Sequence, residues 1–221
     1  MTRLLVLRPE PGASATVERA RKRGLDAIAV PLFEVEPVSW NAPRAEAFDG
    51  LLLTSANAVR HGGEQLQALR TLKVYSVGEQ TARDAEKAGF TVAATGERGV
   101  DQLLGSIRSE LKLLHLCGAD RLQAKRTAQQ ITQLIVYRSK PISAPDLSAA
   151  RGAVVLVHSP RAAQRLAELI KDRSTISIAA ISESAATAAG AGWRTVEAAE
   201  RPTDEGLLAL AARLCNKPHS Q

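Results

Sequence analysis

The sequence predicts a parallel α/β protein made of two similar lobes. Two observations predict this class. Short apolar runs rich in Leu, Val and Ile alternate with helical stretches along the chain, which is typical of parallel α/β units. The second half also repeats the middle: residues 51–59 (LLLTSANAV) reappear as residues 155–163 (VLVHSPRAA), at an offset of 104. A repeat of about a hundred residues indicates two copies of one domain.

The rest of each copy occupies a different place in the chain. Residues 4–8 (LLVLR) resemble residues 113–117 (LLHLC), and residues 27–30 resemble residues 134–137. These segments come first in one copy and last in the other. The simplest explanation is a lobe built from both chain ends, with the second lobe inserted into it.

These matches set the expected domain boundaries. We expect an outer, discontinuous lobe of residues 1–36 and 142–221 and an inserted lobe of residues 37–141, each large enough for its own core. Two short linker segments, near residues 34–38 and 138–141, join the lobes in this scheme. A single continuous domain is the alternative.

The elements follow in order from the apolar runs and their spacing. Strands are expected at residues 3–8, 26–31, 50–54, 73–77, 90–93, 112–117, 133–137, 153–158, 177–181 and 194–197. Helices are expected at residues 13–24, 57–69, 79–88, 100–110, 120–131, 161–171, 183–191 and 204–215. The strands lack strict alternation, which favours sheets covered on both faces. Five strands per lobe predict two small doubly wound, flavodoxin-like sheets, whose ligands bind at the carboxyl ends of the strands.

Composition excludes several classes of protein. The 221 residues are 45% hydrophobic but only 3% aromatic, and no apolar run is long enough to span a membrane. The first expected strand begins directly after the starting Met, so we expect no signal peptide and a cytoplasmic protein. The two cysteines suit a reducing compartment. Without a CxxC, an HExxH or a histidine cluster, we expect no metal site.

The net charge of +6 and the pI near 9.7 indicate an anionic partner. Nucleic acid is one candidate, but the few aromatic residues are scattered and no basic arm is present, so base-stacking surfaces are hard to build. A small polyanion held between the lobes is the better interpretation. We expect no nucleic-acid partner.

A repeated motif stands at the carboxyl ends of the strands. Residues 54–57 (TSAN), 77–82 (VGEQTA) and 158–161 (HSPR) each lead from a strand into a helix, whose free N–H groups can bind a carboxylate. Basic side chains stand nearby in the sequence: Arg8, Arg60, Arg121, Arg138, Arg161 and Arg165. The alternative is that Ser55 and Ser159 only cap their helices and that the arginines are only solvated.

Two further side chains are candidates for chemistry. Tyr137 ends a strand and precedes Arg138, so its phenol could donate a proton to a leaving oxygen. The alternative is that its ring only packs at the lobe junction. Cys117 also ends a strand, where a small buried hydrophobic side chain is the better interpretation than a nucleophile.

At these residues the chain resembles the uroporphyrinogen-III synthase family. The resemblance runs in order through LRPEP at 7–11, TSANAV at 54–59, VGEQTA at 77–82 and HLCGADR at 115–121. It continues through VYRS at 136–139, VHSPRAA at 157–163 and RPTDEGL at 201–207. Each motif is short and unspecific alone, but their order, spacing and rotated duplication together are specific. The resemblance implies two flavodoxin-like lobes joined by a two-stranded linker.

The resemblance also implies an activity. Members convert hydroxymethylbilane, which carries eight carboxylates, to uroporphyrinogen III, with loss of water, inversion of the terminal pyrrole ring and no cofactor. Tyr137 matches the tyrosine thought to assist departure of the hydroxyl. The expected substrate-binding residues are Arg8, Ser55, Asn57, Gly78, Thr81, Arg121, Arg138, Ser159, Arg161 and Ser184. We expect a monomer.

The sequence departs from the family pattern in the second copy of VGxxT. Residues 181–185 read ISESA, so Ser182 replaces the glycine and the hydroxyl moves to Ser184. Glu183 would repel a carboxylate unless it points away. A non-catalytic module that binds a tetrapyrrole or another small polyanion is the alternative function.

Overall fold

The computed structural model describes residues 2–97, 99–120 and 127–216. Its contacts divide the chain into two compact units. Unit 1 comprises Met1–Glu34 and Pro141–Gln221, and unit 2 comprises Val35–Lys140. Arg121, one of the expected substrate-binding residues, lies outside the described residues.

Unit 1 contains a five-stranded sheet in the order β11-β10-β9-β1-β2, and all its neighbouring strands are parallel. Its strands are β1 (Leu4–Val6), β2 (Ala27–Ala29), β9 (Val154–Val157), β10 (Ser177–Ala180) and β11 (Thr195–Ala198). Its α-helices are α1 (Gly12–Lys22), α5 (Pro160–Leu169), α6 (Glu183–Ala189) and α7 (Asp204–Asn216). A short 3-10 helix, η3 (Ser148–Ala150), precedes β9.

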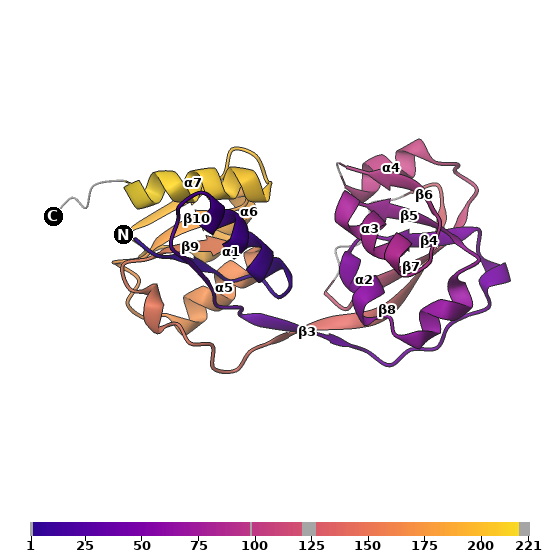
Figure 1. Ribbon diagram of the computed structural model, residues 1–221, viewed down its shortest axis with the longest axis horizontal. Helices are drawn as coiled ribbons and strands as arrows, with labels where there is room; N and C mark the ends of the chain where they lie inside the picture. Colours follow the sequence, from indigo (N-terminus) through magenta and orange to yellow (C-terminus); the bar gives the residue numbers. More distant parts are fainter. Residues whose placement is uncertain (1, 98, 121–126, 217–221) are drawn as a thin grey trace. The chain divides into compact units, whose positions relative to one another are not determined.

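Helices cover both faces of this sheet (Figure 1). Ala13, Val17 and Ala20 of α1 recur at helical spacing and pack with α7 against one face. Residues of α5 and α6, such as Leu166 and Ala185, pack against the other face. Two-sided cover explains the nearly continuous apolar strands, because every side chain of the central strand β9 is buried.

Unit 2 contains a six-stranded sheet in the order β3-β8-β7-β4-β5-β6. Its strands are β3 (Phe33–Pro37), β4 (Gly50–Leu53), β5 (Lys73–Val77), β6 (Val92–Gly96), β7 (Lys112–Gly118) and β8 (Gln130–Pro141). Its α-helices are α2 (Ala56–His61), α3 (Glu79–Lys87) and α4 (Val100–Ser106), and its 3-10 helices are η1 (Ala45–Ala47) and η2 (Glu64–Leu69).

The two sheets have the same order once the rotated repeat is taken into account. The strands β6-β5-β4-β7-β8 of unit 2 correspond in sequence to β11-β10-β9-β1-β2 of unit 1. In each sheet the strand order reverses once, between β4 and β7 in unit 2 and between β9 and β1 in unit 1. These two switch points are where a doubly wound sheet binds its ligands. The predicted α/β fold class is confirmed.

Three element predictions need correction. The helix expected at 57–69 is two elements, because Gly63 adopts a φ of 69° between α2 and η2. The helix expected at 120–131 is wrong in its last part, since residues 127–129 are irregular and residue 130 starts β8, while residues 121–126 lie outside the described chain. The first linker segment is the strand β3, which lies beside β8 at the sheet edge.

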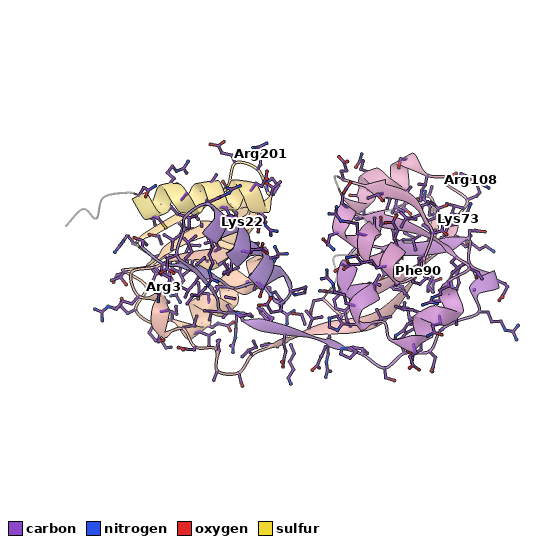
Figure 2. All side chains as sticks on the ribbon, viewed as in Figure 1. Arg3, Lys22, Lys73, Phe90, Arg108 and Arg201 are labelled. Carbon is purple, nitrogen blue, oxygen red and sulfur yellow. The ribbon has the colours of Figure 1, made fainter. Side chains whose placement is uncertain are left out.

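Basic side chains are spread over the surface of both units. Figure 2 shows Arg3, Lys22 and Arg201 of unit 1 and Lys73 and Arg108 of unit 2, all of them exposed. The net positive charge is therefore not confined to the strand ends. None of the helices in the described part of the chain combines the length and the apolar character that crossing a bilayer requires.

Candidate functional site

The switch point of unit 2 gathers residues from three elements. Tyr137 comes from β8, Gly118 ends β7, and Ser55 follows β4 as the N-cap of α2. The parallel register is shifted between Cys117 and Gly118, so that Gly118 is paired with Tyr137 and one residue of β8 is left out of the ladder. Such a bulge re-aims the side chains that follow it. Here it pairs the half-buried Tyr137 with a residue that has no side chain.

The environment of the Tyr137 phenol keeps it protonated. Burial raises the pKa of the phenol above its ordinary value near 10, and hydrogen bonding from the Ser55 side chain and the Gly118 backbone offsets this only in part. Cys117 and Asp120 raise the pKa further through their negative charge when ionised. Tyr137 is therefore a neutral proton donor at physiological pH.

The helix α2 supplies the neighbours of this phenol. Ser55 accepts a hydrogen bond from the Asn57 backbone N–H at 3.2 Å, which places its hydroxyl at the helix start. His61 at the other end of α2 has its ring centroid 6.3 Å from that of Tyr137. Burial and the nearby Arg60 lower the pKa of His61, so this imidazole is neutral at physiological pH. The helix α2 therefore places a hydroxyl and a neutral imidazole near the phenol, whereas Arg60 pairs with Asp84 of α3 at 2.6 Å.

The next strand end in unit 2 carries Gly78 and Thr81. Gly78 has a φ of 80°, which favours glycine, and its backbone N–H donates to Gly96 O at 2.8 Å. Thr81 is only 5% exposed, so its side chain packs inside the unit. The structure therefore places Gly78 at the surface of this strand end and Thr81 beneath it.

The same position in unit 1 is built differently. Ser182 has an extended φ of −156°, and its hydroxyl caps α6 by accepting from Ala185 N at 3.4 Å. Replacement of the glycine by serine thus exchanges a left-handed turn for a side-chain cap. Ser184 is exposed and hydrogen bonded to Ser182 at 3.0 Å, and Glu183 is exposed as well.

The switch point of unit 1 is a charged cluster around Asp204, the first residue of α7. One carboxylate oxygen accepts from Thr16 Oγ1 at 2.9 Å and lies 3.0 Å from His158 Nε2. The other accepts from Arg19 Nε at 2.7 Å. Arg8 is more distant, with its NH1 3.5 Å from the carboxylate. The cluster therefore joins the end of β9 and the helix α1 to the start of α7.

The charges of this cluster fix its protonation states. Burial raises the pKa of Asp204, but hydrogen bonds from His158, Arg19 and Thr16 outweigh it and leave the pKa well below the usual range. Burial lowers the pKa of His158, and Arg8 lowers it further, against the opposite effect of Asp204. A neutral His158 donating to an ionised Asp204 is the state that follows. With two arginines and one carboxylate, the cluster keeps a surplus positive charge.

Most of the other candidate side chains are bound within their own units. Arg161 lies over the Phe33 ring with its guanidinium carbon 4.4 Å from the centroid, a cation–π contact. Arg138 on β8 pairs with Glu36 on β3. Ser159 caps α5 by accepting from Ala162 N at 3.2 Å. Cys117 is 2% exposed.

The sequence analysis did not single out several of these residues. Gly118 could be found only from the bulge. Asp204 could be found from the repeat, because from residue 192 onward the offset is 103 and Asp204 then corresponds to Asp101. His158 stood within the expected helix-start motif, but only its neighbours Ser159 and Arg161 were chosen. Over the described residues, no three His, Cys, Asp or Glu side chains are grouped so as to hold a metal ion.

The fold and these strand ends define a doubly wound α/β protein in two units, with a polar group at each switch point. Comparison with known proteins then gives the family. The model of the family "uroporphyrinogen-III synthase HemD" (HEM4) matches residues 14–209. The chain belongs to the uroporphyrinogen-III synthase family.

Curated relatives and solved structures agree with this assignment. The uroporphyrinogen-III synthase of Chlorobaculum parvum is 32% identical over 101 residues, which are 42% of this chain and 41% of that protein. The porphyrin biosynthesis protein HemD of Ruminiclostridium josui is 28% identical over 109 residues, 43% of this chain and 22% of that protein. The matched segments thus span less than half of either relative.

A solved structure shows the same fold. The crystal structure of uroporphyrinogen-III synthetase from Helicobacter pylori has a TM-score of 0.67 at 16% identity, covering 97% of this chain and all of that one. At this identity the similarity concerns the fold alone. The mixed α/β architecture with parallel sheets is therefore shared with a solved member of the family.

Proposed function

We propose that this chain is a uroporphyrinogen-III synthase, which cyclises hydroxymethylbilane to uroporphyrinogen III in porphyrin biosynthesis. Family membership supports the reaction, and the protonated Tyr137 phenol at the unit 2 switch point is the observation that carries it. This makes the protein a lyase that removes water and inverts the terminal pyrrole ring.

In this proposal Tyr137 is the general acid. The terminal hydroxyl of the substrate leaves as water when the phenol donates its proton to the departing oxygen, while the pyrrole nitrogen supplies electrons to the carbon left behind. The substituted α carbon of the terminal pyrrole then attacks that carbon and forms a spiro intermediate. The bond between this α carbon and its original methylene bridge breaks, and the released methylene is attacked by the free α carbon of the same ring. Two carbon–carbon bonds form and one breaks, so the ring is inverted, and the proton lost from the free α carbon replaces the one given by the phenol. Water is the only by-product and no redox change occurs, so the reaction balances without a cofactor. We therefore propose a cofactor-independent hydro-lyase.

The strand-end groups of each unit are the proposed carboxylate ligands. In unit 2 these are Ser55, Asn57, Gly78, Thr81, Arg121 and Arg138, and in unit 1 they are Arg8, Ser159, Arg161 and Ser184. Thr81 is buried and would act by shaping the start of α3. The surplus positive charge around Arg8 and Arg19 supports binding of a polycarboxylate in unit 1. A cytoplasmic monomer that binds no nucleic acid remains part of the proposal.

The test is to give the purified protein fresh hydroxymethylbilane and to identify the isomer formed. Spontaneous closure gives the non-inverted isomer I, so a synthase must give isomer III at a rate proportional to protein concentration. Isomer I at the uncatalysed rate, together with saturable binding of the substrate, would instead support the non-catalytic binding module.

A further inference from the structure

The contact between Gly118 and Tyr137 leaves no room for a side chain. A Cβ built on Gly118 would lie 2.6 Å from Cε2 and 2.7 Å from Cζ of the Tyr137 ring, and 3.0 Å from the phenol oxygen. Ordinary carbon–carbon contacts are at about 3.5–4.0 Å. The ring therefore lies directly on the main chain at the end of β7. Gly118 has no positive φ, so the backbone itself would accept any residue there.

We propose that Gly118 is a positioning residue for the Tyr137 phenol. Its missing side chain lets the ring lie against the end of β7, with the phenol oxygen beside the Ser55 hydroxyl and the Gly118 backbone N–H. This inference rests on the proposed function in so far as it concerns the reaction rate. The position of the ring itself can be tested independently.

The same arrangement places polar groups next to the phenol. Hydrogen bonding to the Ser55 side chain and to the Gly118 backbone lowers the pKa of the Tyr137 phenol, against the larger effect of burial. Both groups belong to the strand ends that meet at this switch point, so they restrict the position of the ring. The bulge before Gly118 contributes as well, since it brings Tyr137 rather than Val136 opposite the glycine.

Gly118→Ala is therefore expected to displace the ring by about 1 Å. A misplacement of that size can reduce a rate about 100-fold. The loss should fall on kcat, because the substituted residue contacts the catalytic ring and carries no substrate carboxylate ligand. Gly105→Ala is the matched control: Gly105 lies in α4 of the same unit, and a Cβ there would meet nothing within 4 Å.

The experiment combines kinetics with a spectroscopic measurement on the full-length chain. Hydroxymethylbilane turnover is measured for the wild type, Gly118→Ala, Gly105→Ala, Tyr137→Phe and the double variant Gly118→Ala/Tyr137→Phe. The same proteins, including Tyr137→Phe, are labelled with ¹³C at tyrosine Cζ. The chain has two tyrosines, so the Tyr137 signal is assigned by its loss in Tyr137→Phe.

Gly118→Ala should lower kcat with little change in KM, and it should move the Tyr137 Cζ signal while leaving the Tyr75 signal in place. The double variant should be no slower than Tyr137→Phe alone, since no phenol remains to be misplaced. Gly105→Ala should match the wild type in both measurements. An unmoved Tyr137 signal in folded Gly118→Ala would overturn the positioning role. So would a double variant whose loss of kcat equals the product of the two single-variant losses.

Failure of the proposed function gives a different pattern. If the Tyr137 signal moves in Gly118→Ala but neither this variant nor Tyr137→Phe loses rate, the positioning of the ring stands and its catalytic role does not. Should Gly118→Ala fail to fold, Ser55→Ala removes the hydroxyl that is hydrogen bonded to the phenol without adding volume. The Tyr137 signal must then move in Ser55→Ala, and an unmoved signal would refute the arrangement.

Discussion

The switch points of the two units have the same place in the fold but opposite chemistry. In unit 2 the residues that meet there are a phenol, a hydroxyl and a glycine, and burial keeps the phenol neutral. In unit 1 they are a carboxylate, two arginines and a neutral imidazole. One sheet order therefore supports a proton donor in one unit and a fixed ionic cluster in the other.

The difference shows which parts of a duplicated domain are free to change. The central strands β4 and β9 are buried along their whole length in both units, and their apolar character is retained. The residues just beyond the strands lie outside these continuous apolar runs, and their types differ between the two units. Asp101 and Asp204 illustrate this: they are repeat partners, yet Asp101 is exposed on α4 whereas Asp204 organises the unit 1 cluster.

The largest effect is expected at the phenol. Tyr137→Phe removes only the hydroxyl, and loss of a general acid typically lowers a rate about 10²–10⁴-fold. Steady-state turnover of hydroxymethylbilane measures this loss, and chemical denaturation should show an almost unchanged free energy of unfolding. Tyr75→Phe, in the same unit, is the control and should turn over at the wild-type rate. A wild-type rate for folded Tyr137→Phe would assign the ring to packing alone.

The cluster of unit 1 should affect stability more than rate. Asp204→Asn keeps the shape of the side chain but leaves two arginines without their counter-charge, and hydrogen bonds to charged groups contribute about 1.5–3 kcal/mol. We expect the free energy of unfolding to fall by about 1–3 kcal/mol on this scale. The repeat-partner variant Asp101→Asn should change it by less than about 0.5 kcal/mol, as surface substitutions usually do. Equal losses in the two variants would show that the cluster adds nothing.

The pH dependence of stability should depend on His158. Its folded pKa is lowered, so the unfolded chain takes up a proton first, and stability falls as pH falls below the ordinary value near 6.5. Asp204, with its lowered pKa, acts in the same direction at more acidic pH. His158→Gln keeps an N–H donor toward Asp204 but cannot titrate. Unfolding free energies between pH 7 and 5 should therefore depend less steeply on pH in this variant. His61 is present in both proteins, so its contribution cancels in the comparison. Plots of unfolding free energy against pH that run parallel for the two proteins would show that His158 does not cause the pH dependence.

Single arginines should have the smallest effects. Arg138 is exposed and paired with Glu36, and Arg161 lies on Phe33, so in the proposed function each would add only a solvent-screened contact to a carboxylate. An exposed charge pair contributes about 0.2–1 kcal/mol, which corresponds to a KM raised about fivefold or less in Arg138→Ala or Arg161→Ala. KM for hydroxymethylbilane should also rise with salt, because exposed charges are screened over ~10 Å at 0.1 M. A single arginine whose loss abolishes binding, with no salt dependence, would indicate one bidentate anchor instead.

The sequence predicted most of the fold because the strands are buried on both faces. All ten expected strands are present, and the rotated repeat anticipated the common strand order. The strand β3 was absent from the strands expected from apolar runs, because its sequence, FEVEP, contains two glutamates and a proline, and only the family resemblance implied it. The break in the helix at 57–69 depends on the positive φ of Gly63, which a helical pattern does not reveal.

The sequence predicted those candidate site residues whose side chain is itself the reason for choosing them. Tyr137 was found as a phenol next to an arginine, although it was expected to end its strand and β8 instead continues to Pro141. Gly118 was missed because its role depends on a one-residue register shift between two strands. Arg8 and Asp204 are 196 positions apart in the chain, and only packing of α1 and α7 on one face of the sheet brings them together.

The point at which the chain leaves and re-enters unit 1 has a consequence for folding. The backbone N–H of Ile142 donates to Leu32 O at 2.9 Å, so the two segments of unit 1 meet across a gap of about a hundred residues. Closing a loop of this length in a disordered chain costs about 4–5 kcal/mol. Unit 2 is continuous in sequence, and when it is folded, its edge strand β3 and the neighbouring strand β8 bring those two segments together. We therefore expect the inserted unit to reduce the entropic cost of assembling the discontinuous one, and we expect mutations that delay its folding to delay the assembly of unit 1 as well.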